Sequence, residues 1–135
     1  MALDAGLALQ KALYATLSGD TALTGLIGLR LYDNVPGDTA FPYITMGEGR
    51  MMDWSSDTHD GAEHRLVFHI YTRTGGRSLI KTIAGALKAR LHNASLVLTD
   101  HRLVNMRFIE ADIVRLADGV TWHGMVRFRA VTEAI

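Results

Sequence analysis

Four residues that could ligate a metal ion lie close together in one polar segment of the sequence: His59, Asp60, Glu63 and His64. Imidazole and carboxylate groups are common ligands of divalent metals, but a metal site needs several of them held in a fixed geometry. No other segment rich in such ligands lies beside this one, and spacings of this kind arise by chance in acidic loops. We therefore expect a solvated segment here and no metal ion.

Groups that could catalyse a reaction show no recognisable arrangement. The chain has no cysteine, which excludes disulfides, zinc-thiolate and iron-sulfur sites, and thiol catalysis. No serine stands in a G-x-S-x-G sequence. His69 lies among apolar residues of a predicted strand, where a hydrogen-bonded structural histidine is a simpler interpretation than a catalytic base. The sequence predicts no catalytic residue, no cofactor and no enzymatic activity.

Two glycine-containing segments could hold an anion. Residues 47–50 (GEGR) lack the third glycine and the following helix of a dinucleotide-binding loop, and the glutamate would repel a phosphate. Residues 74–77 (TGGR) precede a predicted helix, whose free N-terminal amides favour negative charge. An ordinary strand-to-helix turn also explains this second segment. A small anion-binding module is therefore kept only as an alternative function.

Charged side chains are unevenly distributed, although fourteen Lys and Arg residues balance fourteen Asp and Glu residues. Residues 47–72 carry five acidic and two basic side chains, whereas residues 73–99 carry five basic and no acidic ones. Complementary patches can direct identical subunits head to tail, the contact that closes rings, whereas the alternative is two solvated surfaces. The interface residues predicted from charge are Glu48, Asp53, Asp57 and Asp60 in the loop and Arg77, Lys81, Lys88 and Arg90 around the helix.

Three large apolar residues, Met51, Met52 and Trp54, lie within the same polar loop. Methionine adapts to irregular surfaces, and tryptophan is a frequent anchor at protein interfaces. We add these three residues to the predicted partner interface. The competing interpretation is that they fold back into a small core of their own.

The periodicity of apolar residues predicts two principal helices and several strands. A helix is expected over residues 4–18, and Asp20 can cap a short helical turn that ends at Leu26. Ser78 can cap a second long helix, which buries the stripe Ile80, Ile83, Ala84, Leu87 and Leu91 and ends at Asn93. Strands are predicted at 29–35, 43–47, 63–73, 96–98, 103–116 and 120–131, with a long loop or an extended hairpin tip over 47–61.

The strand predicted at 103–116 changes the parity of its apolar residues between Phe108 and Ile109, which a single β-bulge explains. Asp118-Gly119 then forms a two-residue hairpin signal, so this strand and the next should pair antiparallel. Apolar and polar residues alternate in 120–131, which is typical of a sheet with one face buried in the core and the other exposed to solvent or to a partner. The fold class is α+β: a single domain over 1–135, mostly antiparallel β-sheet, with two principal helices packed against it and a long protruding loop or hairpin.

The overall composition excludes several classes of protein. With a formal net charge of zero, the chain has no basic field to attract nucleic acid or an acidic membrane surface. No apolar stretch approaches the roughly twenty residues of a membrane span, and the start of the sequence lacks the pattern of a signal peptide. We expect a cytoplasmic protein with no membrane partner.

The order of these features resembles the tail-completion or tail-terminator proteins of long-tailed phages and of phage-derived gene transfer agents. The resemblance rests on the short leading helix, Phe41-Pro42-Tyr43-Ile44, the strand 64–73, Gly76 before the helix 79–91, and the closing hairpin. It covers nearly the whole chain, including its length.

The resemblance implies a non-enzymatic homo-hexameric ring that ends the tail tube and joins it to the connector or stopper protein below the head. Its partners would be the tail-tube protein and the connector, with DNA present only in transit through an axial channel, in a particle released from the cell. The alternative within such a particle is another ring subunit of the neck or tail, either the stopper or the tube protein. The family has no catalytic residues to carry over to this chain.

Overall fold

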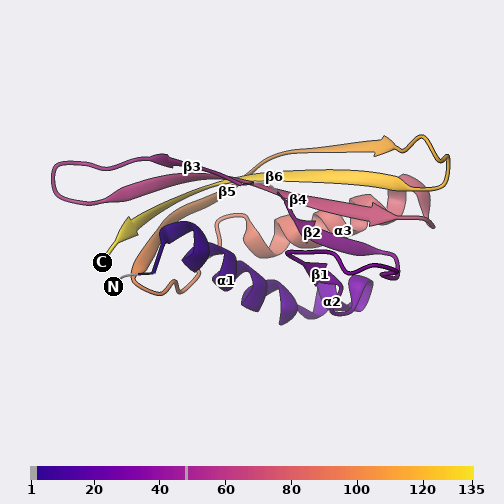
Figure 1. Cartoon of the computed structure of the whole chain (residues 1–135), viewed down its shortest axis with the longest axis horizontal. Helices are drawn as coiled ribbons and strands as arrows, with labels where there is room; N and C mark the ends of the chain where they lie inside the picture. Colours follow the sequence, from indigo (N-terminus) through magenta and orange to yellow (C-terminus); the bar gives the residue numbers. More distant parts are fainter. Residues whose placement is uncertain (1–2, 48) are drawn as a thin grey trace.

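A computed structural model describes residues 3–47 and 49–135 and shows three helices against one face of a six-stranded sheet (Figure 1). The predicted α+β fold class is confirmed. The elements are α1 (Ala5–Ser18), α2 (Thr21–Ile27), β1 (Leu31–Tyr32), β2 (Tyr43–Met46), β3 (Arg50–Asp53), β4 (Gly61–Thr72), α3 (Gly76–Leu91), β5 (His101–Arg115) and β6 (Trp122–Ala134).

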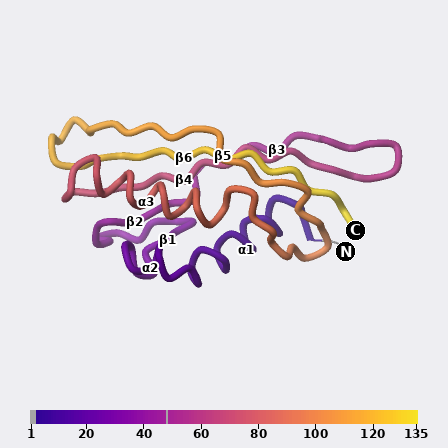
Figure 2. Tube along the Cα trace, turned by 180° about the vertical axis from the view of Figure 1, so that it is seen from behind, coloured from indigo at the N-terminus to yellow at the C-terminus, as the bar shows by residue number. Residues whose placement is uncertain are grey.

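The sheet is built around β4, which lies in the middle of the strand order. The strand order is β1-β2-β4-β6-β5, and β3 pairs with β4 beside β2. Therefore β2 and β3 follow one another along the same edge of β4, which pairs with β6 on its other edge over its whole length. All pairings are antiparallel except that of β1 with β2. The second face of this sheet carries no helix (Figures 1 and 2).

The first two helices begin where the sequence predicts. The Asp4 carboxylate accepts a hydrogen bond from the amide of Leu7 at 3.2 Å, and Asp20 accepts one from Leu23 at 3.0 Å. Each carboxylate satisfies an amide that would otherwise lack a partner in the first helical turn. The periodicity and the capping residues therefore locate α1 and α2 to within a residue or two.

The start of α3 differs from the prediction that Ser78 caps it. The N-cap is Gly75, which makes no side-chain cap and has a φ of 75°; Gly76 follows with a φ of 54°. These left-handed conformations, which glycine adopts without steric cost, turn the chain from β4 directly into the helix. Ser78 therefore lies inside the first turn, where its carbonyl accepts a hydrogen bond from the Thr82 hydroxyl at 2.9 Å.

The core lies between the helices and the inner face of the sheet. Ile80, Ile83, Leu87 and Leu91 of α3 are all buried, as predicted, and Ala84 is half-buried at the edge of the core. They pack with α1, α2 and the alternate residues of β4 and β6 that point inward, among which Phe68 and Phe128 meet edge to face. This core fixes which residues of β4 and β6 point outward.

Two of the predicted strands are short or absent. Only Leu31–Tyr32 of the segment 29–35 pairs, because Leu29 is exposed and the chain turns away at Asp33. Segment 96–98 forms no strand and contributes one isolated bridge, from Val97 to Arg102. The buried Leu98 explains the apolar pattern without a strand.

The predicted bulge is confirmed. The register between β5 and β6 shifts between Phe108 and Glu110, leaving Ile109 as the extra residue, and a second shift lies between Leu103 and Asn105. The antiparallel pairing of β5 with β6 is also confirmed. The connection, however, is longer than the predicted two-residue turn, because the amide of Leu116 donates to the Thr121 carbonyl across residues 117–120.

Asp118 organises this connection, and we expect its titration to report that role. Its carboxylate accepts hydrogen bonds from the Thr121 hydroxyl and amide and from the Val120 amide, which lower its pKa from 3.8 to about 2. Its contribution to stability is therefore present above pH 3.8 and is lost as the pH falls through about 2. An NMR titration of the Asp118 carboxyl carbon should give this low midpoint, and Thr121→Val should raise it; a midpoint near 3.8 in the unmodified chain would contradict this.

None of the helices in the described residues is both long enough and apolar enough to cross a membrane.

Candidate assembly surfaces

A β-hairpin extends beyond the helices at one end of the molecule (Figures 1 and 2). Its strands are β3 and the beginning of β4, paired from Arg50 with Arg65 to Asp53 with Ala62. The Trp54 amide donates to the Gly61 carbonyl at 2.9 Å and closes the tip, residues 54–60. Of the two predicted forms, a long loop or an extended hairpin, the structure has the hairpin.

The hairpin tip is acidic. Asp53, Asp57 and Asp60 are all exposed there, and no Lys or Arg occurs between residues 51 and 64. The Ser55 hydroxyl donates to the Asp53 carboxylate at 2.6 Å and accepts from the Gly61 amide at 3.1 Å, so the turn is ordered by its own side chains. Glu48, the remaining predicted acidic interface residue, lies outside the described residues.

The three large apolar residues of the hairpin do not form one patch. Met51, half-exposed, lies on the helical side near Gly6, whereas Met52 lies on the opposite side, across from Glu63. Trp54 is 57% exposed, and the Arg129 guanidinium lies 5.2 Å from its ring centroid. They therefore do not fold together into a separate small core, and their place in a partner interface stays a prediction.

The four basic residues of α3 remain at the surface, and three of them already have partners within the chain. Arg77 lies over the Trp122 ring at 4.6 Å, and Lys88 lies over the Phe108 ring at 4.6 Å. Arg90 approaches Asp20 at 4.0 Å. Lys81 is exposed, with no aromatic or acidic partner among the described residues. The hairpin tip and α3 occupy different regions of the molecule (Figure 1), so their opposite charges are available to different neighbours.

The helix-free face of the sheet carries a line of four arginines that the sequence pattern did not predict. Arg50 on β3 pairs in register with Arg65 on β4, Arg65 with Arg129 on β6, and Arg129 with Arg107 on β5. We call these four residues the arginine row. The alternation of apolar and polar residues in 120–131 predicts that Arg129 points outward. The alignment of the four arginines depends on the register between the strands, which the spacing of residues along the sequence does not reveal.

Aromatic and imidazole rings stack on the same face, farther from the hairpin. Tyr71 stacks on Tyr43 at 5.1 Å and on His123 at 4.5 Å, and His69 Nδ1 lies 2.7 Å from His123 Nε2. Burial, followed by the neighbouring His69, lowers the pKa of His123, while burial raises the pKa of both tyrosines. His69 is therefore a hydrogen-bonded histidine, as predicted, but it lies on the open face.

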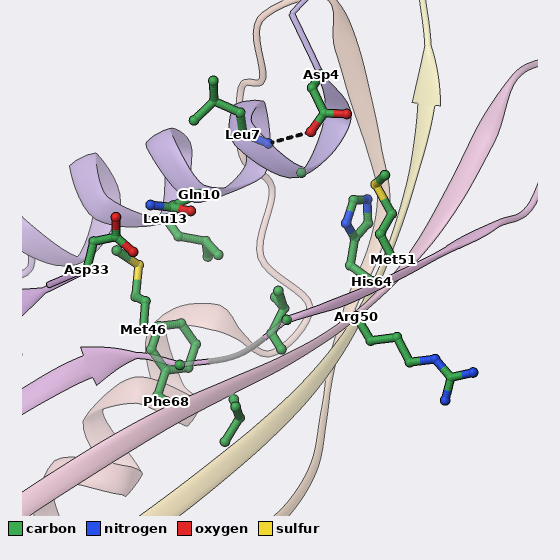
Figure 3. Close-up of a pocket in the computed structure, with 15 residues that line it drawn as sticks. Asp4, Leu7, Gln10, Leu13, Asp33, Met46, Arg50, Met51, His64 and Phe68 are labelled. Atoms are coloured by element: carbon green, nitrogen blue, oxygen red, sulfur yellow. Dashed lines mark hydrogen bonds between the residues drawn. The ribbon is translucent and has the colours of Figure 1, made fainter.

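An apolar groove of about 380 Å³ separates α1 from β2, β3 and β4 (Figure 3). Leu13, Met46 and Phe68 line it, together with the carboxylates of Asp4 and Asp33. Its buried imidazole, His64, is bonded to the Thr132 hydroxyl at 2.9 Å, and burial lowers its pKa. The groove thus contains apolar contact area and a histidine already engaged in the fold.

The residues considered for a metal site are separated by the structure. Glu63 is buried on the open face with Arg65 and Arg129, while His64 points to the opposite side of β4 and His59 lies at the hairpin tip. Across residues 3–47 and 49–135, no three His, Cys, Asp or Glu side chains gather as a metal site would require.

Comparison with known proteins identifies what the chain resembles. The family described as tail completion protein gp17 matches residues 11–133. The tail completion protein gp17 of Bacillus phage SPP1 is 23% identical over 122 residues, which cover 90% of each chain. A chain in the virion of a native gene transfer agent particle is 35% identical, with a TM-score of 0.89 over 96% of this chain and 97% of that one.

Proposed function

Because the chain belongs to the tail completion protein gp17 family, a family of structural virion proteins, we propose that six copies form a ring that ends the tail tube and joins the tail to the head connector. The observation that carries this proposal is the near full-length similarity to a chain of a gene transfer agent virion, in sequence and in fold. The ring leaves an axial channel for DNA and has no enzymatic role. Assembly takes place in the bacterial cytoplasm, before the particle is released.

The distribution of charge supports a ring of identical subunits. A closed ring needs two different lateral surfaces on each subunit, and charge complementarity between them can direct association. The acidic hairpin tip and the basic surface of α3 meet this requirement, because they lie apart in one chain and have opposite charge. In this arrangement Asp53, Asp57 and Asp60 of one subunit approach Lys81 and its basic neighbours on the next. Met51, Met52 and Trp54 supply apolar contacts to the copies or tail proteins on either side of the hairpin.

Electron microscopy of the purified protein, and of particles with and without it, tests the ring. We expect a six-fold ring, and we expect particles without this chain to have tails of unregulated length or unattached heads. Intact, infectious or gene-transferring particles formed without the chain would overturn the proposal. Long tubes assembled from this protein alone would instead identify it as the tube subunit.

Reversing two charges of α3 should weaken lateral association by about tenfold or more, since two attractive pairs become repulsive. The variant is Lys81→Glu with Lys88→Glu, and sedimentation at increasing protein concentration measures its association. Lys11→Glu, the same change on α1, is the control and should associate normally. A matching reversal in the tip, Asp57→Lys with Asp60→Lys, should restore association when mixed with the α3 variant. Unchanged association of the α3 variant would remove these residues from the lateral contact.

A further inference from the structure

We propose that the helix-free face of the sheet, at the arginine row, is the surface that faces DNA in the channel and contacts its phosphates. This inference rests on the proposed ring, because a ring subunit needs one surface for the channel wall. All three helices cover the other face of the sheet (Figure 1), which leaves this face as the broad uncovered surface of the described chain.

The alignment of the row is costly to the fold, which favours a role outside it. Like charges directly opposite one another on neighbouring strands destabilise a sheet. Within the chain, Glu63 compensates part of this cost by accepting hydrogen bonds from Arg65 at 2.9 Å and Arg129 at 2.7 Å. Arg50 and Arg107 are exposed and have no carboxylate partner among the described residues. Two cations at the two ends of the row are therefore left for an external anion.

The chemistry of this face suits phosphate. Every cationic side chain on the strands is an arginine, whereas the three lysines of the chain, Lys11, Lys81 and Lys88, lie on helices. The guanidinium group presents a planar fork of donors that matches phosphate oxygens, and a lysine ammonium does not. Arg50, Arg65 and Arg127 also line one shallow depression of about 280 Å³.

The width of the row favours an extended polyanion over the acidic hairpin tip of a neighbouring copy. Four strands at their usual spacing of roughly 4.8 Å place its two ends about 14 Å apart. A hairpin tip is only two strands wide, so it covers about half of the row, whereas the phosphates of DNA recur without interruption. The positive side chains of the row and its surroundings are Arg50, Arg65, Arg107, Arg127 and Arg129. The negative side chains beside them are Glu63, Glu110 and Asp112. This partial neutralisation limits the strength of the contact, which suits DNA that must move.

Fluorescence anisotropy of a short labelled DNA duplex with the full chain, at low and at increasing salt, tests the proposal. The variant Arg50→Gln with Arg107→Gln removes the two unpaired cations and leaves the Glu63 ion pairs intact. Each lost phosphate contact lowers the salt slope by about 0.9, so we expect the slope to fall by about 2 and binding at low salt to weaken about tenfold or more. The control, Lys11→Gln, removes a cation of the helical side that lies outside the proposed lateral contact, and it should bind DNA like the unmodified chain.

The outcomes separate this inference from the proposed ring. Absence of DNA binding by the unmodified chain, or equal weakening by the arginine variant and by the Lys11→Gln control, overturns the role of the row in contacting DNA. Unchanged DNA binding with weakened ring formation in the arginine variant also overturns it, and assigns the row to a contact between copies. Ring formation is followed by electron microscopy on the same samples, so a failure of the ring proposal is seen independently of DNA binding.

Discussion

Replacing Phe128 with alanine is expected to lower the free energy of unfolding by about 3–5 kcal/mol, the usual cost of emptying a buried aromatic site. Phe128 is 1% exposed at the centre of β6. Its ring meets Phe68 and Phe108 edge to face, at centroid distances of 5.8 and 5.9 Å. The substitution therefore removes contacts to both neighbouring strands at once, and rings held in three different strands cannot easily close the cavity.

Urea denaturation measures this loss as a lower midpoint with an unchanged slope. Val97→Ala is the control, because Val97 is 96% exposed and its substitution should change stability by no more than about 0.5 kcal/mol. Phe108→Ala should cost less than Phe128→Ala, since Phe108 is half-buried and lies in an edge strand. A cost for Phe128→Ala no larger than that of Val97→Ala would contradict the position assigned to the core.

Local patterns predicted the elements whose stability is decided by nearby residues. The capping carboxylate of Asp20, the apolar stripe of α3 and the parity change at Ile109 are each confirmed at the predicted position. The errors occur where conformation depends on contacts distant in sequence. Leu98 is apolar because it is buried, not because it lies in a strand, and the start of α3 depends on the conformation of Gly75.

The candidate surfaces also differ in whether they depend on nearby residues or on contacts distant in sequence. Composition located the acidic hairpin tip and the basic helix, because charge along a short segment is visible in the sequence. It could not show that Arg77 and Lys88 lie over aromatic rings of β6 and β5. Nor could it align Arg50 with Arg107, which are separated by two strands and joined only through the register of the sheet. A surface made of one residue from each of four strands requires the tertiary structure.

Gly124 of β6 lies directly beneath Ile80 of α3, and Gly124→Ala should lower the free energy of unfolding by about 1–3 kcal/mol, as overpacking of a core does. A Cβ atom at this position would lie 2.5 Å from Ile80 Cγ2 and 3.5 Å from Ile70 Cβ. The methyl group of Ile80 sits on a β-branched, fully buried side chain, so it cannot rotate away without moving the helix.

A double-mutant cycle distinguishes this clash from a general effect of losing a glycine. In an Ile80→Ala background the obstructing methyl group is gone, so Gly124→Ala should cost much less there, or should stabilise by filling part of the cavity. Gly85→Ala on α3 is the matched control: a Cβ at Gly85 meets nothing within 4 Å, and alanine in place of glycine in a helix should stabilise by about 0.5–1 kcal/mol. Equal costs of Gly124→Ala in both backgrounds would mean that Ile80 does not set the distance between α3 and the sheet. Thermal or urea unfolding of the four proteins gives the coupling energy directly.

Because α3 lies against the inner face while the arginine row lies on the outer one, Gly124→Ala should leave the salt dependence of DNA binding unchanged as long as the chain is folded.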